Sequence, residues 1–477
     1  MRGYRGVNNK KVRYKNIIAY GLGDLYGGGA FLIIGTLFLI FLTDIVGLSP
    51  ARAGLILIIG KSWDAISDPI MGYLSDHTKT KYGRRRIYFL IAIIPIAISF
   101  ILLWAPVNFS SNRLLFYYYL FAYIFFSTVF TMVMVPYSAL NAEISENYKT
   151  RTKLSTSRML FSQFSALLAG VLPKIIINQF PIEKQGYFIM SIIFAILYAL
   201  PWIIVFKGTW ELPYKNLNKS KRLNLNSFKT VFANKSFRIH IGMYLSAYVA
   251  MDFLMALFIY FLNYYLQKEN LFPYTMLALL LSQIIMLPIY MKISNKYGKG
   301  KAYRIGLSIW GSAMIFSFLL SPSSSILSII IISIFMGIGL SAGVMVPWAV
   351  LPSIADIDEL ISKEKRTGIY SGLMTLIRKL AQAIALWITG LLLSLIHYIP
   401  NQTQSTDTLF KLRLIFILIP LSLIIIGLFF ASKFKITPEK HKILIQEINR
   451  IKAGGKKKDV KDKVRIICEE LTGLPYK

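Results

Sequence analysis

Residues 325–352 read SILSIIIISIFMGIGLSAGVMVPWAVLP and contain no charged side chain. A helix of about 20 apolar residues is long enough to cross the hydrocarbon core of a membrane. Similar runs recur from Ile17 to Ala431, and the chain is 55% hydrophobic and 16% charged, with a mean hydropathy of +0.55. Soluble domains are about a quarter charged. The sequence therefore predicts an all-α membrane protein, and the continuous runs exclude a transmembrane barrel of alternating strands.

Twelve transmembrane helices are predicted, in two groups of six. The first six lie at about 17–43, 52–75, 87–105, 114–141, 156–178 and 186–206. The second six lie at about 241–266, 273–292, 303–320, 325–352, 368–397 and 413–431. The predicted domains are an N-terminal six-helix half at 1–206, a cytoplasmic linker at 207–240, a C-terminal six-helix half at 241–431, and a basic amphipathic tail at 432–477.

The basic residues predict the orientation of the chain. Lys and Arg number 54 against 22 Asp and Glu, a net charge of +32. They gather at both chain ends and on the even-numbered connections, and basic loops stay in the cytoplasm. We therefore predict cytoplasmic termini in the cell (inner or plasma) membrane, and we attribute the charge to topology and lipid contact rather than to nucleic-acid binding. We expect the tail to form one or two amphipathic helices on the inner leaflet or on the protein itself.

An internal repeat relates the two halves. DPIMGYLSDHTKTKYGRRR (68–86) matches LPIYMKISNKYGKGKAYR (287–304) at a Pro-Ile pair, a Ser-Asp or Ser-Asn pair and a Tyr-Gly pair. VPYSALNAEIS (135–145) matches VPWAVLPSIAD (346–356), and a basic turn follows each. Two six-helix halves in parallel duplication are the plan of the major facilitator fold, in which substrate lies between the halves.

The first repeat also predicts a gating contact. Asp76 ends the second span, and Gly83, Arg84 and Arg85 follow it in a basic turn. An Asp–Arg latch here would stabilise one packing of the helices over another and so bias a two-state equilibrium. The alternative is a basic loop that only sets topology.

Two acidic residues inside the second span predict a cation site. Asp64 and Asp68 are four residues apart, so they share one helix face, where a bound cation or proton would relieve their repulsion. Charged residues inside a membrane usually mark ion or substrate paths. Lys61 lies one turn before Asp64 and is our further gating candidate. The alternative is an internal Lys–Asp–Asp salt bridge with no transported ion.

Other polar and aromatic residues are candidates for substrate binding. Asp24, within YGLGDLYGGGA, could bind substrate hydroxyls or a neighbouring helix. Asp252 is favoured as a structural hydrogen-bonding group. Tyr137 and Trp348 could stack on the C–H face of a sugar, although aromatic residues more often serve packing. Basic residues within the spans include Arg158 and the pair Arg378-Lys379.

The sequence argues against other classes of site. The four His residues are scattered, so no metal site is expected beyond a possible Na⁺ at Asp64 and Asp68. Cys468 is the single cysteine, which excludes a disulfide scaffold. No catalytic constellation is found, so we predict that the protein is not an enzyme. We expect no cofactor other than a coupling ion, H⁺ or Na⁺.

Several motifs together resemble a known family. YGLGD, TDIVGLSPARAG, KSWDAISDPIMGYLSDHTKTKYGRRR, VPYSALNAEIS and IADIDELISKEKRTG are similar to segments of the glycoside–pentoside–hexuronide:cation symporters, which include the melibiose permeases. The resemblance covers about residues 16–435. It implies the major facilitator fold and symport of a small hydrophilic solute with Na⁺, Li⁺ or H⁺.

The resemblance also implies roles for single residues. Asp64 and Asp68 match the cation-binding acids of the family, and Thr131 matches a polar neighbour of that site. Arg158 and Lys379 match cationic positions near the sugar and the cation. The melibiose permeases differ at three positions: their third cation-site acid falls on Met134, their sugar-binding acid in the first span on Gly28, and their stacking Trp on Ser138. These departures argue against melibiose as the substrate, and a two-carboxylate site favours H⁺.

The function predicted from the sequence is secondary active transport. We expect cation-coupled symport of a sugar, glycoside or related small hydrophilic solute by alternating access. The alternative is an uncoupled facilitator, or a transporter of lysolipids or another non-sugar solute, with the same fold. The expected partners are the small-molecule substrate and membrane lipids, without nucleic acid, and we expect a monomer.

Overall fold

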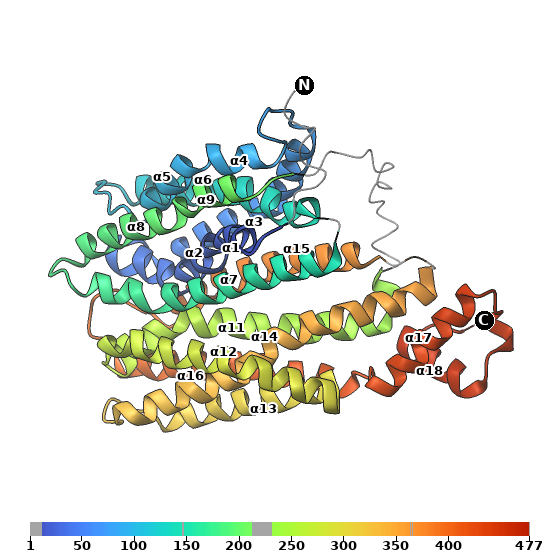
Figure 1. Cartoon of the computed structure of the whole chain (residues 1–477). Helices are drawn as coiled ribbons and strands as arrows, with labels where there is room; N and C mark the ends of the chain where they lie inside the picture. Colours follow the sequence, from blue (N-terminus) through green and yellow to red (C-terminus); the bar gives the residue numbers. More distant parts are fainter. Residues whose placement is uncertain (1–11, 146, 212–230, 363, 365, 477) are drawn as a thin grey trace. The chain divides into compact units, whose positions relative to one another are not determined.

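All regular secondary structure is helical in the part of the chain that the structure describes. The computed structural model describes residues 12–145, 147–211, 231–362, 364 and 366–476, and no strand occurs among them (Figure 1). The helices of the N-terminal part are α1 (Tyr14–Leu22), α2 (Asp24–Ile33), α3 (Pro50–His77), α4 (Arg86–Ile91), α5 (Ile93–Trp104), α6 (Asn112–Ile144), α7 (Tyr148–Ile177), α8 (Glu183–Ala199) and α9 (Pro201–Gly208). Later in the chain are α11 (Lys235–Tyr260), α12 (Phe272–Tyr297), α13 (Lys299–Phe316), α14 (Ile326–Ser362), α15 (Thr367–Leu395), α16 (Thr406–Lys433), α17 (Pro438–Lys452) and α18 (Asp462–Thr472).

Ten helices of the described chain are long and apolar enough to cross a membrane. The other two predicted spans correspond to α3 and to the pair α4 and α5. α3 has 28 residues but contains Lys61, Asp64 and Asp68, which make it less apolar. α5 is a short apolar helix of 12 residues, separated from α4 by Ala92. The protein is therefore a multi-pass membrane protein.

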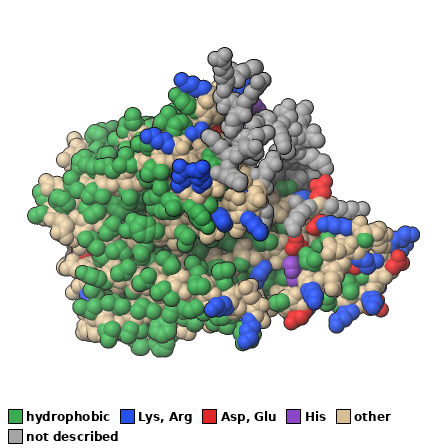
Figure 2. All heavy atoms as spheres, in the orientation of Figure 1, with side chains coloured by type: hydrophobic (Ala, Val, Ile, Leu, Met, Phe, Trp, Pro, Cys, Tyr) green, Lys and Arg blue, Asp and Glu red, His purple; other side chains and the backbone are tan. Residues whose placement is uncertain are grey.

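The exposed side chains suit a lipid surrounding. Leu418, Ile425 and Phe429 of α16 are all about half exposed, although they are among the most apolar side chains of that helix. An exposed apolar surface of this extent would be unstable in water, but it is favourable against hydrocarbon. Figure 2 shows hydrophobic side chains over the long helices, while Lys and Arg gather toward the end where α17 and α18 lie.

The repeat predicted from the sequence has matching backbone geometry. Pro69 lies inside α3 and Pro288 lies inside α12. Gly83 and Gly298 both have positive φ, +105° and +91°, and each precedes the next helix of its half by a few residues or less. A positive φ is readily adopted only by glycine, so the two Tyr-Gly turns share a backbone requirement.

The chain packs as two compact units, whose described residues fall within 1–217, 255–277 and 382–412 for unit 1, and within 218–254, 278–381 and 413–477 for unit 2. The segments 255–277 and 382–412 belong to the C-terminal half by sequence, yet they pack within unit 1. Inside unit 2, α13 and α14 approach closely, because a Cβ on Gly306 would lie 2.2 Å from the Cβ of Ala342. Glycine is needed at that crossing.

The tail forms two helices that dock on unit 2. α17 and α18 lie beyond the C-terminal end of α14 (Figure 1), where their apolar residues Leu444, Ile448, Ile467, Cys468 and Leu471 are buried. His441 Nε2 lies 3.1 Å from Asp356 Oδ2, and Lys452 Nζ lies 2.6 Å from Glu359 Oε1. His441 and Lys452 of the tail therefore face acidic residues of α14, so the tail packs on the protein, as one of our two predicted placements has it.

Candidate functional site

The predicted cation-site residues lie on α3 and α6 of unit 1. Asp68 Oδ1 accepts a hydrogen bond from Thr131 Oγ1 at 2.9 Å, and Thr131 accepts one from Ser67 at 3.2 Å. Asp64 is fully buried and lies 3.2 Å from Lys61 Nζ, which is also buried. The structure thus brings Asp68 and Thr131 together, and it gives Asp64 an internal cation.

Lys61 has a second contact that holds its position. Its ammonium group lies 3.1 Å from the ring centroid of Phe31 on α2. A cation over an aromatic ring is stabilised electrostatically, most of all where water is excluded. Lys61 is therefore held next to Asp64 as a counter-ion from the same helix.

The candidate substrate residues of unit 1 form an acid–arginine–aromatic cluster. Arg158 Nε on α7 lies 3.2 Å from Asp24 Oδ1 on α2, and its guanidinium carbon lies 5.1 Å from the ring centroid of Tyr137 on α6. Tyr137 is 0% exposed, and its hydroxyl donates to the Tyr20 carbonyl at 2.6 Å. Tyr137 therefore orients Arg158, which is the more accessible group of the cluster.

A second cluster of the same kind lies in unit 2. Arg378 on α15 donates two hydrogen bonds to Asp252 on α11, at 2.7 and 2.8 Å, and lies 4.9 Å from the ring centroid of Tyr248. Tyr248 accepts a hydrogen bond of 2.9 Å from Trp348 Nε1 on α14, and Trp348 is 41% exposed. Lys379, the cation that we predicted here, is half-buried next to Arg378.

The two clusters occupy equivalent places in the repeat. Tyr137 and Trp348 are the third residues of the matching VPY and VPW motifs, and each belongs to a cluster that contains an Asp–Arg pair. The sequence predicts Lys379 as the cation of this region and favours Asp252 as a structural hydrogen-bonding group, but it does not predict the Arg378–Asp252 pair. A signal for this pair is present in the sequence: Asp252 is the acidic residue of the seventh predicted span, and Arg378 is a basic residue inside the eleventh.

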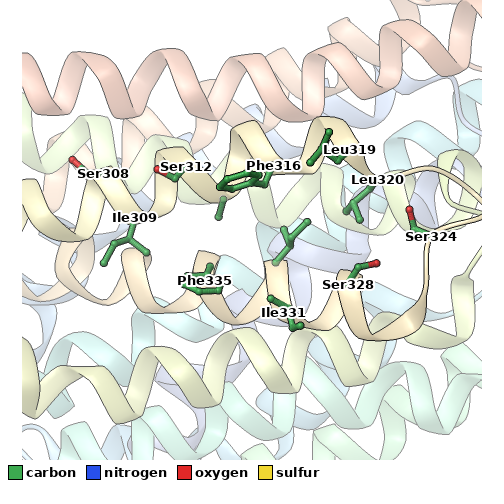
Figure 3. A pocket seen from close by; sticks show the side chains of 12 residues that line it. Ser308, Ile309, Ser312, Phe316, Leu319, Leu320, Ser324, Ser328, Ile331 and Phe335 are labelled. Atoms are coloured by element: carbon green, nitrogen blue, oxygen red, sulfur yellow. The ribbon is translucent and has the colours of Figure 1, made fainter.

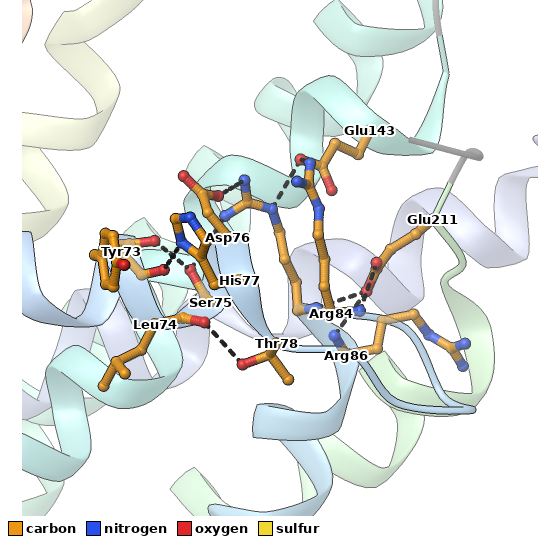
Figure 4. Close-up of polar contacts among 12 residues, drawn as sticks. Tyr73, Leu74, Ser75, Asp76, His77, Thr78, Arg84, Arg86, Glu143 and Glu211 are labelled. Atoms are coloured by element: carbon orange, nitrogen blue, oxygen red, sulfur yellow. Dashed lines mark hydrogen bonds and ion pairs between the residues drawn. The ribbon is translucent and has the colours of Figure 1, made fainter. Parts of the chain in front are cut away.

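Three of the predicted gating residues, Asp76, Arg84 and Arg85, form an ion-pair network at the end of α3 (Figure 4). Arg85 Nη2 lies 2.7 Å from Asp76 Oδ1, and Arg85 Nε lies 2.8 Å from Glu143 Oε1. Arg84 Nη2 contacts the same oxygen of Glu143 at 2.5 Å. Glu143, which the sequence analysis did not select, lies in the VPYSALNAEIS motif of α6 and joins the two arginines.

Gly83 lets a third carboxylate, that of Glu211, approach this turn. Glu211 accepts hydrogen bonds from the backbone N–H groups of Arg84, Arg85 and Arg86 at 2.8–2.9 Å. A Cβ on Gly83 would lie 2.5 Å from Glu211 Oε1, and the φ of Gly83 is +105°. Glycine is therefore required at position 83 for two reasons: its backbone conformation, and the space that the Glu211 carboxylate occupies.

A pocket of about 690 Å³ lies elsewhere in unit 2, between α13 and α14 (Figure 3). Its walls are mainly apolar and include Phe316, Leu319, Ile331 and Phe335, with serine hydroxyls toward both ends. None of the residues that line it belongs to the predicted cation, substrate or gating groups. The pocket is therefore separate from the candidate site.

Comparison with known proteins identifies the family. Residues 19–438 match the family of MFS/sugar transport proteins. The chain belongs to this family. The resemblance to the cation symporters is confirmed, and the protein is an MFS-type transporter rather than an enzyme.

Individual relatives match this MFS transporter over most of its length. It is 27% identical to the uncharacterized symporter YjmB of Bacillus subtilis, covering 92% of this chain and 96% of the relative. It is 26% identical to the sodium-dependent lysophosphatidylcholine symporter 1-A of Danio rerio, covering 87% and 85%. It is 25% identical to the glucuronide carrier protein homolog of Escherichia coli, covering 93% and 97%.

A solved structure shares the fold. The inward-facing bacterial homologue of the human lysosomal transporter Spinster aligns with a TM-score of 0.64, at 14% identity, over 89% of this chain and 98% of that one. At this identity the likeness establishes the major facilitator fold alone. The all-α fold class predicted from the sequence is confirmed.

Proposed function

We propose that this transporter carries a glycoside or similar small hydrophilic solute together with a cation, H⁺ or Na⁺, by alternating access. It would do so as a monomer with twelve spans and cytoplasmic termini in the cell membrane. The observation that carries the proposal is the placement of Asp64 and Asp68 on α3, one beside Lys61 and the other beside Thr131.

Cation coupling is supported by two carboxylates that share one face of α3. Lys61 Nζ lies 3.2 Å from Asp64, and Asp68 accepts a hydrogen bond from the hydroxyl of Thr131. An incoming Na⁺ would find the oxygens of Asp68 and Thr131, which are hard ligands of the type that such cations prefer. A proton on Asp68 would remove one negative charge from this helix face. Either ion would ease the movement of α3 through an apolar environment.

A hydroxylated solute suits the two acid–arginine clusters. The guanidinium groups of Arg158 and Arg378 are held by Asp24 and Asp252, and each rests near an aromatic ring. A guanidinium group held in one orientation presents a rigid fork of N–H donors, which can recognise an oxygen-rich ligand with defined geometry. The exposed ring of Trp348 offers an apolar face for the C–H surface of a sugar. The relative named as a glucuronide carrier supports this substrate class.

The second candidate function is transport without a coupling ion, or transport of a lysolipid. The salt bridge between Lys61 and Asp64 favours it, because an internally neutralised carboxylate does not require an imported cation. Similarity to the relative named as a lysophosphatidylcholine symporter favours the lipid substrate.

Proteoliposome transport separates these functions. Counterflow of a panel of labelled glycosides is measured with and without Na⁺ at two pH values, and uphill uptake is then measured under an imposed Na⁺ or H⁺ gradient. Our proposal predicts accumulation above equilibrium that depends on one of the gradients. Counterflow that is indifferent to both, or that occurs with lysolipids and with no glycoside, would establish the second candidate instead.

A further inference from the structure

A carboxylate at the end of the first span is held by hydroxyl groups. Asp44 lies in η2 (Phe41–Ile45), beyond the apolar part of that span, and accepts a hydrogen bond of 2.5 Å from Thr43 Oγ1. Tyr398 donates to both of its oxygens, at 2.8 and 2.7 Å, and Tyr264 donates to Oδ2. The backbone carbonyl of Asp44 also accepts from Asn401. All of these residues belong to unit 1.

Asp44 differs from four buried aspartates of the protein. Asp24, Asp64, Asp252 and Asp358 each have an arginine or lysine within about 3 Å. Among the residues that the structure describes, no cation pairs with Asp44. Asp44 is half-buried, and a charged carboxylate that is partly removed from water is costly unless it is paired; hydrogen bonds from neutral hydroxyls offset only part of that cost.

The groups that face Asp44 do not supply a positive charge. Tyr260 and Tyr264 face it from the end of α11 and from η3 (Phe261–Tyr265), and Tyr398 faces it from the segment after α15. On α8 the facing groups are Tyr187 and Glu183, and Glu183 adds negative charge. The cation of this region, Lys174 on α7, is bound by Glu183 at 3.4 Å and by Glu269 at 2.5 Å.

The contacts of Asp44 join segments that come from both predicted halves. Asp44 ends the first span, Tyr264 ends the seventh, and Tyr398 and Asn401 follow the eleventh. In the predicted orientation this end of the helices faces outward. A substrate path from outside requires these segments to separate, and separation would expose Asp44 to water.

We propose that Asp44 is a proton-binding site that controls the outer gate, so that a proton taken up from outside favours closure of the Asp44, Tyr264 and Tyr398 cluster. The proposal rests on the proposed alternating access and adds a second titratable site to it. A neutral carboxylic acid can still accept hydrogen bonds from the tyrosines through its carbonyl oxygen.

The direction of the effect follows from linkage. Burial raises the pKa of Asp44 in the closed cluster; the hydrogen bonds from Thr43, Tyr264 and Tyr398 lower it in part, Glu183 raises it, and the net shift is upward. In an opened, hydrated gate the carboxyl would titrate near its ordinary value, about 3.9. The closed state therefore binds the proton more tightly, so external acid stabilises closure and rising pH favours opening.

Accessibility of an introduced cysteine tests this directly. Gly35 lies three turns after Asp24, on about the same helix face, and a Cβ there would have open space within 4 Å. The Gly35→Cys variant is made with Cys468→Ala, which removes the native thiol, and is labelled in right-side-out vesicles with a membrane-impermeant thiol reagent. Ser323→Cys, exposed on the loop between α13 and α14, corrects for the intrinsic pH dependence of the reagent.

We expect the corrected labelling rate at Gly35→Cys to fall as external pH falls, by up to about tenfold for each unit by which the two pKa values differ. Asp44→Asn should abolish this pH dependence. Asp407→Asn, the same change at an exposed acid paired with Lys411, should preserve it. Tyr398→Phe, which keeps the carboxylate but removes its hydrogen bonds, should raise labelling at every pH.

A wild-type labelling rate that does not vary with pH, or an Asp44→Asn protein that retains the variation, would overturn the proposal. The proposal would also be overturned if adding Tyr398→Phe to the Gly35→Cys protein did not speed its labelling. This second variant keeps the test decisive if Asp44→Asn does not fold. The assay needs neither a substrate nor a gradient. The two proposals can therefore fail separately. If labelling depends on pH as expected but the protein shows no coupled uptake, the proposed symport is refuted and the proton gate is supported.

Discussion

Replacement of Gly83 by alanine should destabilise the protein in two separable ways. The φ of +105° is unfavourable for any residue with a Cβ, and the new methyl group would lie 2.5 Å from Glu211 Oε1. The carboxylate would have to move away from the three backbone N–H groups that it now binds. Gly298, the equivalent glycine of the repeat, has φ +91° but only an ordinary 3.4 Å contact with Pro438 Cδ. It is therefore a matched control for the backbone strain alone.

The expected magnitudes differ accordingly. Gly298 has ψ 150°, a conformation that essentially only glycine adopts, so backbone strain of about 1–3 kcal/mol should be the whole effect of Gly298→Ala. A hydrogen bond to a charged group contributes about 1.5–3 kcal/mol. Because three such bonds would be weakened rather than all lost, we expect Gly83→Ala to cost about 2–3 kcal/mol beyond the strain.

The free energy of unfolding can be measured by SDS titration of the purified protein in mixed micelles. In a Glu211→Ala background the carboxylate is absent, so Gly83→Ala should then cost no more than Gly298→Ala does. This double-mutant cycle isolates the contact between the glycine and the carboxylate. Equal costs for the two glycine variants in the native background, or an unchanged cost of Gly83→Ala without Glu211, would refute the reasoning.

The remaining predictions concern the two aspartates of α3, the Arg378–Asp252 pair and the tail. Asp64→Asn and Asp68→Asn should each abolish uphill uptake in proteoliposomes while leaving membrane insertion intact, and normal accumulation by either variant would contradict its coupling role. Arg378→Lys keeps the charge but loses the two-bond contact with Asp252, so the half-saturating substrate concentration in counterflow should rise about tenfold; unchanged kinetics would contradict a role in binding. Burial raises the pKa of Cys468 to about 12, so at pH 8 the native thiol should react with a maleimide about a thousandfold more slowly than in the unfolded chain; rapid labelling of the folded protein would show that the tail is not packed as described.

The sequence could predict those parts of the site that depend on local spacing. Asp64 and Asp68 lie one helical turn apart in any α-helix, and the Tyr-Gly turns of the repeat require glycine because of their backbone conformation. The candidate roles of these residues remain predictions. Distances were harder to predict: Lys61 precedes both Asp64 and Asp68 on one helix stripe, and the folded chain places its Nζ 3.2 Å from Asp64.

Contacts between distant segments could not be predicted in the same way. Glu143 and Glu211 meet the arginine turn from α6 and from the segment after α9, and neither follows from the spacing of that turn. The Arg378–Asp252 pair joins residues 126 positions apart. The sequence places both residues inside predicted spans but does not show that they pair, because charges inside a membrane can be paired in several ways until the helices are placed.

Hydrophobic periodicity and the position of basic residues are properties of the chain itself, so the sequence alone determined the class of protein, the helices and the repeat. The partners of the buried charges were decided only by tertiary packing, because side chains on different helices acquire neighbours when the helices pack. Asp44 illustrates the difference: in the sequence it is one acid at the end of a span, and in the folded protein it is a carboxylate bound by hydroxyl groups from its own span and from two distant segments.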